Sequence, residues 1–131
     1  MTVKKTYVIL PDKGEIELDY LKECVHWAKQ DTYERRKWFA RPALIERRGG
    51  VSSQLYTGQT FDEKYFSLEA DGWTHDHCEI CFTTLSGFSD DVTDSEGYFN
   101  GHVWICQSCH SLFIKVEDIT TSIDRLEKIV K

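Results

Sequence analysis

The sequence has no apolar run that approaches the roughly 18 consecutive residues of a membrane-spanning helix. Residues 1–10 include two lysines and lack both a long apolar segment and a small-residue cleavage site, so we expect no secretory signal. These absences predict a cytoplasmic chain that does not enter a membrane. Glycine-rich phosphate loops and nucleophile elbows are also missing, so the chain lacks the usual signals of nucleotide-binding proteins and serine hydrolases.

Internal repeats are absent except for two Cys-x-x-Cys turns, and 131 residues is the length of one ordinary domain. Hydrophobic residues make up 40% of the chain and aromatic residues 13%, which is enough apolar surface for a core. We therefore expect residues 1–131 to form a single domain of the α+β class. Small and polar residues at 49–60 mark the best internal boundary, between a half at 1–60 and a half at 61–131.

The charge of the chain divides unevenly between these halves. Residues 1–60 hold 11 Lys and Arg against 8 Asp and Glu, whereas residues 61–131 hold 5 against 14, and the whole chain carries a net charge of −6. The first half is therefore called basic and the second acidic. This balance disfavours a general nucleic-acid binder, because affinity for phosphate comes mostly from accumulated positive charge.

The basic half predicts one strand and one helix. Residues 6–10 are mostly β-branched or aromatic and are closed by Pro11, which indicates a strand and a turn. A helix is predicted with Asp19 as its N-cap, because apolar residues recur at helical spacing up to Ala28. The helical pattern is expected to continue, after a break, over residues 33–38.

The acidic half predicts a strand, a hairpin and two helical segments. Residues 65–68 are strand-like, and residues 97–105 place an Asn-Gly pair between two apolar strands, which is typical of a type I′ hairpin. The chain is expected to turn helical directly after this hairpin. A last helix, capped by Thr121 or Ser122, is expected to end near Val130.

Four of the five cysteines form the two Cys-x-x-Cys turns, the first cysteine turn (Cys78–Cys81) and the second cysteine turn (Cys106–Cys109), with 24 residues between them. A two-residue spacer lets backbone N–H groups point toward the sulfurs, so two such turns complete a closed four-sulfur shell. In a reducing compartment this shell predicts one structural Zn²⁺, with an iron–sulfur cluster or a redox pair as the alternative. The predicted ligands are Cys78, Cys81, Cys106 and Cys109.

The remaining cysteine, Cys24, lies in an apolar helical pattern and is expected to be a buried thiol, with a reactive or extra-ligand role as the alternative. Four of the five histidines lie near the turns: His75, His77, His102 and His110. Each is able to replace a cysteine ligand, but we expect hydrogen-bonded or surface histidines, because four thiolates already satisfy the metal.

A metal-dependent enzyme would need one ligand position open to water. The histidines His75, His77 and His110 are the candidates to lie near such a metal, with Glu79 as a general base. The His-x-Glu and Pro-Cys-x-x-Cys pattern of the zinc deaminases is absent, because no proline precedes Cys106. The sequence therefore predicts no catalytic residue.

The order of features around the cysteines resembles the treble-clef zinc finger. A cysteine turn, a variable segment, a hairpin and a second turn that runs into a helix follow one another up to Val116, and a zinc ribbon is the nearest competing arrangement. Several further residues also look like those of small bacterial cytosolic proteins: Gly72, Trp73, His75, His77, Gly97, Tyr98, Trp104 and Ile105. The resemblance covers the acidic half and not residues 1–60.

We therefore expect the N-terminal strand and helix to pack on a structural zinc module with its own β-hairpin and C-terminal helix, and the resemblance implies a treble-clef-like arrangement of that module. It implies no reaction, because treble clefs serve as nucleic-acid readers, protein-binding modules and simple scaffolds.

Residues 35–48 are the only nucleic-acid-like feature, with six basic residues against one acidic residue and aromatics interleaved. Basic side chains beside aromatic ones contact phosphate and stack on bases in single-strand binders. The candidate contacts are Arg35, Arg36, Lys37 and Arg41. The alternative is that Trp38 and Phe39 pack inward while the arginines pair with the acidic half.

Acidic side chains gather in the polar stretch 86–100, which is expected to be an exposed loop: Asp90, Asp91, Asp94 and Glu96. They lack the ordered alternation of an EF-hand, so we interpret them as a solvated loop that is able to dock a basic protein partner. Small size, acidity and the missing catalytic constellation favour a protein-binding protein over an enzyme. Analogy narrows this hypothesis to a bacterial immunity or antitoxin-type protein that occludes its partner.

Overall fold

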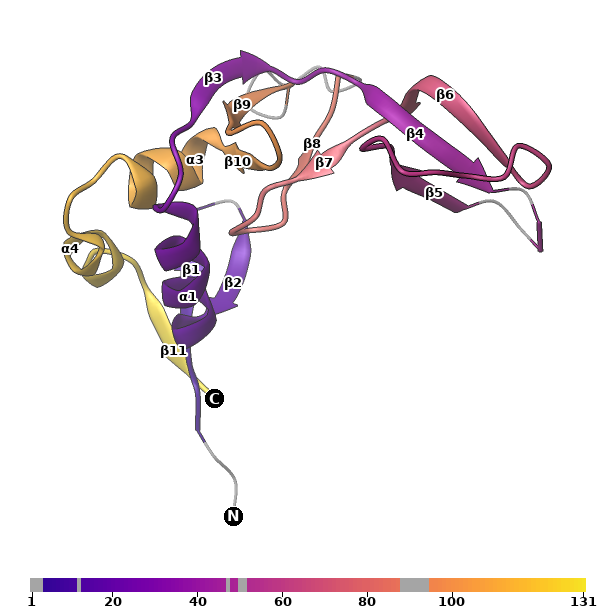
Figure 1. Cartoon of the computed structure of the whole chain (residues 1–131). Coiled ribbons are helices and arrows are strands. Elements are labelled where there is room, and N and C mark those ends of the chain that lie inside the picture. Colours follow the sequence, from indigo (N-terminus) through magenta and orange to yellow (C-terminus); the bar gives the residue numbers. More distant parts are fainter. Residues whose placement is uncertain (1–3, 12, 47, 50–51, 88–94) are drawn as a thin grey trace.

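The computed structural model describes residues 4–11, 13–46, 48–49, 52–87 and 95–131. Short strands in small sheets dominate these residues and the helices are few, so the fold is mixed α and β, as predicted (Figure 1). Among the helices of the described ranges, none combines the length and the apolar character that a membrane span requires.

The N-terminal strand and helix are confirmed. Strand β1 (Thr6–Leu10) pairs with β2 (Gly14–Glu17) across a tight turn in which Gly14 has a φ of 87°, a conformation that favours glycine. Helix α1 (Leu18–Ala28) follows at once. Asp19 is therefore not the N-cap: it lies in the first turn, where a negative charge still complements the helix dipole.

The last part of the chain is not the helix expected from its apolar spacing. Helix α4 (Ile119–Asp124) is capped by the Asp118 side chain, which accepts a hydrogen bond from Thr120 N, rather than by Thr121 or Ser122. Residues Lys128–Val130 form strand β11, which pairs antiparallel with β1 and completes the order β11-β1-β2. The unpaired edge of β1 therefore outweighs the local helical pattern, because it supplies partners for backbone groups along β11.

Residues 33–38 are also not helical. Strand β3 (Glu34–Lys37) pairs with β9 (Glu96–Phe99), and β9 pairs with β10 (Trp104–Cys106) in the order β10-β9-β3. Neighbours far along the chain thus decide the conformation of a segment whose own pattern was helical.

The predicted hairpin is confirmed in β9 and β10, but its turn differs from the type I′ expectation. Four residues separate the paired Phe99 and Trp104. Gly101 has a positive φ of 101°, whereas Asn100 is not in the left-handed region. The Asn100 side chain instead accepts hydrogen bonds from the backbone N–H groups of His102 and Val103, both at 2.8 Å, and stabilises a wider loop.

A third sheet lies at one end of the molecule (Figure 1). It contains β4 (Arg41–Glu46), β5 (Ser52–Leu55) and β6 (Phe66–Trp73) in the order β5-β4-β6, and is called the distal sheet. Part of the stretch 49–60, which the sequence marked as a boundary, therefore belongs to β5 and pairs with β4. The expected strand at 65–68 runs on to Trp73.

One cluster of buried residues forms the main core. It joins α1, β1 and β10 to the helical segments α3 (Gln107–Cys109), η1 (His110–Ile114, a π-helical turn) and α4. Its largest fully buried members outside the cysteines include Trp104, Phe113, Leu21, Ile80 and Ile105. Burying one such side chain stabilises the fold by about 1.5–3 kcal/mol, so this cluster is the main apolar contribution to folding.

Candidate metal centre

The four predicted sulfur ligands meet at one point. The Sγ atoms of Cys78, Cys81, Cys106 and Cys109 all lie within 4.8 Å of one another. Cys78, Cys106 and Cys109 are at most 1% exposed, and Cys81 is half-buried. This spacing and burial could hold one metal ion in a closed four-sulfur shell.

Backbone hydrogen bonds shape the first cysteine turn. It lies between β7 (Asp76–His77) and β8 (Thr84–Leu85), which pair with each other. The backbone N–H of Ile80 points at Cys78 Sγ at 3.4 Å, and Phe82 N donates to Cys78 O at 3.0 Å. The two-residue spacer therefore places N–H groups around the sulfur, as the sequence predicted.

The second cysteine turn begins where β10 ends. Cys106 caps α3, and its sulfur accepts a hydrogen bond from Cys109 N at 3.4 Å. The two turns are also joined through the backbone, because Glu79 N donates to Trp104 O at 3.0 Å and Cys78 forms a parallel bridge with Trp104. Cys81 Sγ consequently lies 3.6 Å from Cys106 Sγ.

The electrostatics of the four thiols fit a cation. Hydrogen bonding from Cys106 lowers the pKa of Cys81, and hydrogen bonding from Cys109 lowers the pKa of Cys106. Hydrogen bonds to Cys106 raise the pKa of Cys78 and of Cys109. Four thiols this close cannot all lose their protons without strong repulsion between the thiolates. A divalent cation that binds all four thiolates would offset this repulsion.

No histidine of the described ranges belongs to this ligand cluster. His77 Nδ1 lies 3.2 Å from Phe82 O, and the His75 and His77 rings contact edge to face. His110 stacks on Tyr98 with ring centroids 3.4 Å apart, and burial lowers its pKa. The four sulfurs alone therefore form the candidate ligand set, without His75, His77 or His110.

Three of the histidines share a hollow of about 480 Å³ beside the first cysteine turn. His75, His77 and His102 line it together with Glu79, whose pKa is raised by partial burial and then by the charge of Asp76. Three of these side chains, His75, His77 and Glu79, were predicted from the sequence as candidates for an open metal site. The structure places them along a hollow rather than at the sulfurs.

A polar network next to the hollow could not be found from the sequence. Asp76 accepts hydrogen bonds from Trp38 Nε1 and Trp73 Nε1, both at 2.9 Å, and forms an ion pair with Arg41 at 2.9 Å. The Asp76 and Arg41 side chains are only 12% and 14% exposed. A buried, hydrogen-bonded ion pair of this kind fixes the base of the distal sheet, where β4 begins and β6 ends.

Two of the four basic candidates at 35–48 are paired inside the chain. Arg41 binds Asp76, and Arg35 donates to Glu96 Oε2 at 3.2 Å and to Gln107 Oε1 at 3.3 Å. Arg36 stacks over the Phe39 ring at 4.6 Å, and Lys37 is exposed on β3. Because these ion pairs already occupy Arg41 and Arg35, they favour the alternative in which the arginines pair with the acidic half.

The acidic candidates are only partly within the described ranges. Asp90, Asp91 and Asp94 lie outside the described residues. Glu96 lies on β9, where its side chain is 21% exposed and faces Arg35. Cys24, expected to be a buried thiol, is half-buried beside the core, and burial raises its pKa.

No protein-family model, no curated protein and no solved structure matches the chain. The site must therefore be interpreted from its own residues.

Proposed function

We propose that Cys78, Cys81, Cys106 and Cys109 bind one structural zinc ion in a treble-clef-like module. The meeting of four sulfurs within 4.8 Å carries this proposal. Zinc is the metal of choice for tetrahedral thiolate shells, and the closed shell leaves no position for a reacting water. The hairpin β9–β10, the second cysteine turn and the helical segment behind it follow one another in the treble-clef order.

The chain then acts as a zinc-stabilised protein-binding protein rather than as an enzyme. The acidic half carries 14 Asp and Glu against 5 Lys and Arg, which favours a basic protein partner. Asp90, Asp91, Asp94 and Glu96 are the proposed contacts, and a bacterial immunity or antitoxin-type role is the specific hypothesis. Such a protein occludes its partner and needs no catalytic residue.

The metal is tested by purifying the protein without chelator and measuring its elements. One zinc per chain is expected. A cobalt-substituted sample should give the absorption bands of a four-thiolate tetrahedral site. A spectrum that requires a nitrogen or water ligand would contradict the closed sulfur shell and would reopen the enzyme hypothesis.

The partner is tested by affinity capture from a lysate of the source cells. A basic protein should be recovered, and the triple variant Asp90→Lys, Asp91→Lys and Asp94→Lys should lose it. The matched control reverses three exposed acidic residues elsewhere in the same half: Glu117, Asp124 and Glu127. Equal loss in both variants would mean that net charge alone acts, and the acidic stretch would not be the contact.

A further inference from the structure

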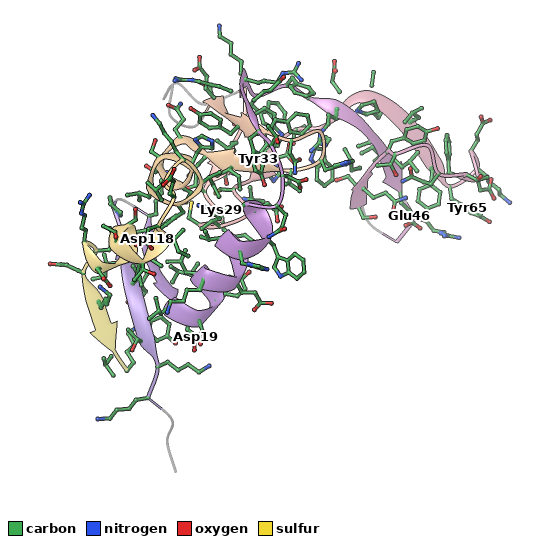
Figure 2. The ribbon with its side chains drawn as sticks, turned by 60° about the vertical axis from the view of Figure 1, so that its left-hand side comes forward. Asp19, Lys29, Tyr33, Glu46, Tyr65 and Asp118 are labelled. Carbon is green, nitrogen blue, oxygen red and sulfur yellow. The ribbon has the colours of Figure 1, made fainter. Side chains whose placement is uncertain are left out.

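A groove of about 660 Å³ lies between α1 and the first cysteine turn. Four aromatic side chains line it: Tyr20 and Trp27 from α1, Tyr33 from the segment after α1, and Phe82 from the end of the turn. Trp27 is 66% exposed, Phe82 62% and Tyr20 45%. In Figure 2, Tyr33 lies where the C-terminal end of α1 meets the part of the chain that surrounds the cysteines. The groove therefore presents open aromatic faces.

The charge inside this groove is negative. Asp31 and Glu79 line it, and no Lys, Arg or His does so among the residues that the structure describes. Asn100 Nδ2 donates to Asp31 Oδ2 at 3.0 Å and holds that carboxylate in place. Burial raises the pKa of the Tyr33 hydroxyl, and the charges of Asp31 and Glu79 raise it further. Both carboxylates thus contribute negative charge to the groove near the Tyr33 hydroxyl.

The position of the Phe82 ring has a conformational cost. Phe82 has a φ of 64°, and it is the only non-glycine residue of the described ranges with a positive φ. A bulky side chain rarely adopts this backbone, which glycine accepts freely. Backbone strain of this kind is common at functional sites. Here the strained residue places an exposed ring at the groove edge.

We propose that this groove, called the aromatic groove, binds a lysine or arginine side chain from a basic segment of a partner protein. The aromatic faces would attract the cation, and Asp31 and Glu79 would neutralise it. A purely apolar occupant would bury both carboxylates without a counter-charge, and an anion would be repelled. The inference rests on the proposed protein-binding function and names contact residues other than Asp90, Asp91, Asp94 and Glu96.

The test uses the full zinc-loaded chain and a blocked peptide that carries two arginines among glycines and serines. Binding is followed through the indole N–H resonance of Trp27, which is assigned by its loss in Trp27→Ala. The arginine peptide should shift this resonance, whereas the same peptide with neutral citrulline should not. Titration calorimetry measures the affinity of the variants, because Trp27→Ala lacks the reporting resonance. Trp27→Ala and Glu79→Gln should each weaken binding about tenfold, as expected for losing one cation–π contact or one charge.

Phe82→Gly is the sharpest variant, because glycine suits the left-handed backbone and the lost ring is mostly exposed. It should keep or raise the thermal midpoint and still weaken peptide binding about tenfold. Matched controls outside the groove are Leu68→Ala, which removes an exposed apolar side chain, and Glu63→Gln, which removes an exposed charge. Neither control should change the affinity.

Equal binding of the arginine and citrulline peptides, an unshifted Trp27 resonance, or equal effects of the groove and control variants would overturn the inference. Suppose that a basic partner is recovered, that Phe82→Gly still binds it normally, and that the Asp90, Asp91 and Asp94 reversals abolish binding. This result would contradict the role of the groove and leave the proposed function intact. Peptide binding that depends on the groove, with no partner recovered from cells, would instead count against the proposed function.

Discussion

The body around the cysteines and the distal sheet are built in different ways. In the body, α1, β1, β10 and the helical segments bury one continuous cluster that includes the sulfurs. The distal sheet buries Ala43 and Leu44, and these two do not belong to that cluster. Figure 2 shows Glu46 of this sheet, and Tyr65 directly before β6, at the opposite end of the molecule from Asp19 and Asp118. The cluster of four sulfurs thus belongs to the continuous core of the body, while the sheet depends on backbone pairing and a small core of its own.

Removal of the bound metal should destabilise the body far more than the distal sheet, and this is the largest effect that we expect. Because structural zinc is worth on the order of 10 kcal/mol in apparent binding, chelation or Cys106→Ser should unfold the body. Amide hydrogen exchange should become fast in α1 and β10, while β4 and β6, which we expect to be weakly protected because their core is small, should change little. Equal loss in both regions would mean that the sheet folds only on the metal-bound body. Cys24→Ser is the matched control, since Cys24 lies outside the sulfur cluster.

Truncation of a buried side chain should separate the two cores. Phe113→Ala removes a fully buried ring from the body and should lower the free energy of unfolding by about 3–5 kcal/mol. Leu44→Ala should cost about 2 kcal/mol, because the thin sheet closes part of the cavity. Denaturant unfolding gives both values, and exchange in β4 should rise only for Leu44→Ala. A global loss of protection in Leu44→Ala would show that the sheet and the body unfold together.

The Asp76 network joins the two regions, so breaking it should loosen their connection. Asp76→Asn leaves Arg41 nearly buried without its counter-charge and should cost about 3 kcal/mol in denaturant unfolding. The indole N–H resonances of Trp38 and Trp73 should move, because both groups donate to Asp76. Asp71→Asn, an exposed change on β6, is the control. Unmoved indole resonances in Asp76→Asn would contradict the network.

Surface ion pairs should contribute least to the free energy of unfolding in either region. Arg48 pairs with Glu46 at 3.0 Å on the distal sheet and stacks over Tyr65, yet its side chain is 58% exposed. Arg48→Ala should therefore cost less than about 1 kcal/mol, and less still at high salt. Lys5→Ala on the body, which loses the exposed pair with Glu17, should behave alike. A loss above 2 kcal/mol would mean that the Arg48 pair is more shielded from water than its exposure indicates.

The sequence was most informative where chemistry and local geometry agree. Two Cys-x-x-Cys turns predicted the sulfur cluster because a two-residue spacer leaves few ways to point both sulfurs at one centre. Strand β1 and helix α1 were also predictable, since apolar spacing and burial coincide there. The zinc identity and the treble-clef arrangement stay predictions.

The two segments wrongly predicted as helical share one cause, which is pairing between segments distant along the chain. Residues 33–38 and the stretch that ends near Val130 were predicted to be helical, yet residues 34–37 and 128–130 pair as strands with β9 and β1. A local pattern does not contain the edge of a strand that is almost the whole chain away. The Asp76 network was hidden for the same reason, because Trp38 and Arg41 come from a different part of the chain.

The link between Glu79 N and Trp104 O has a consequence for chain length. It closes, together with the sulfur cluster, a segment of 24 residues between the two cysteine turns. The free-energy cost of closing a loop grows only logarithmically with its length, by about 0.6 kcal/mol for each doubling. Insertions between Gly87 and Ser95 should therefore be tolerated far better than insertions within either turn, so the segment can vary in length while the sulfur geometry is kept.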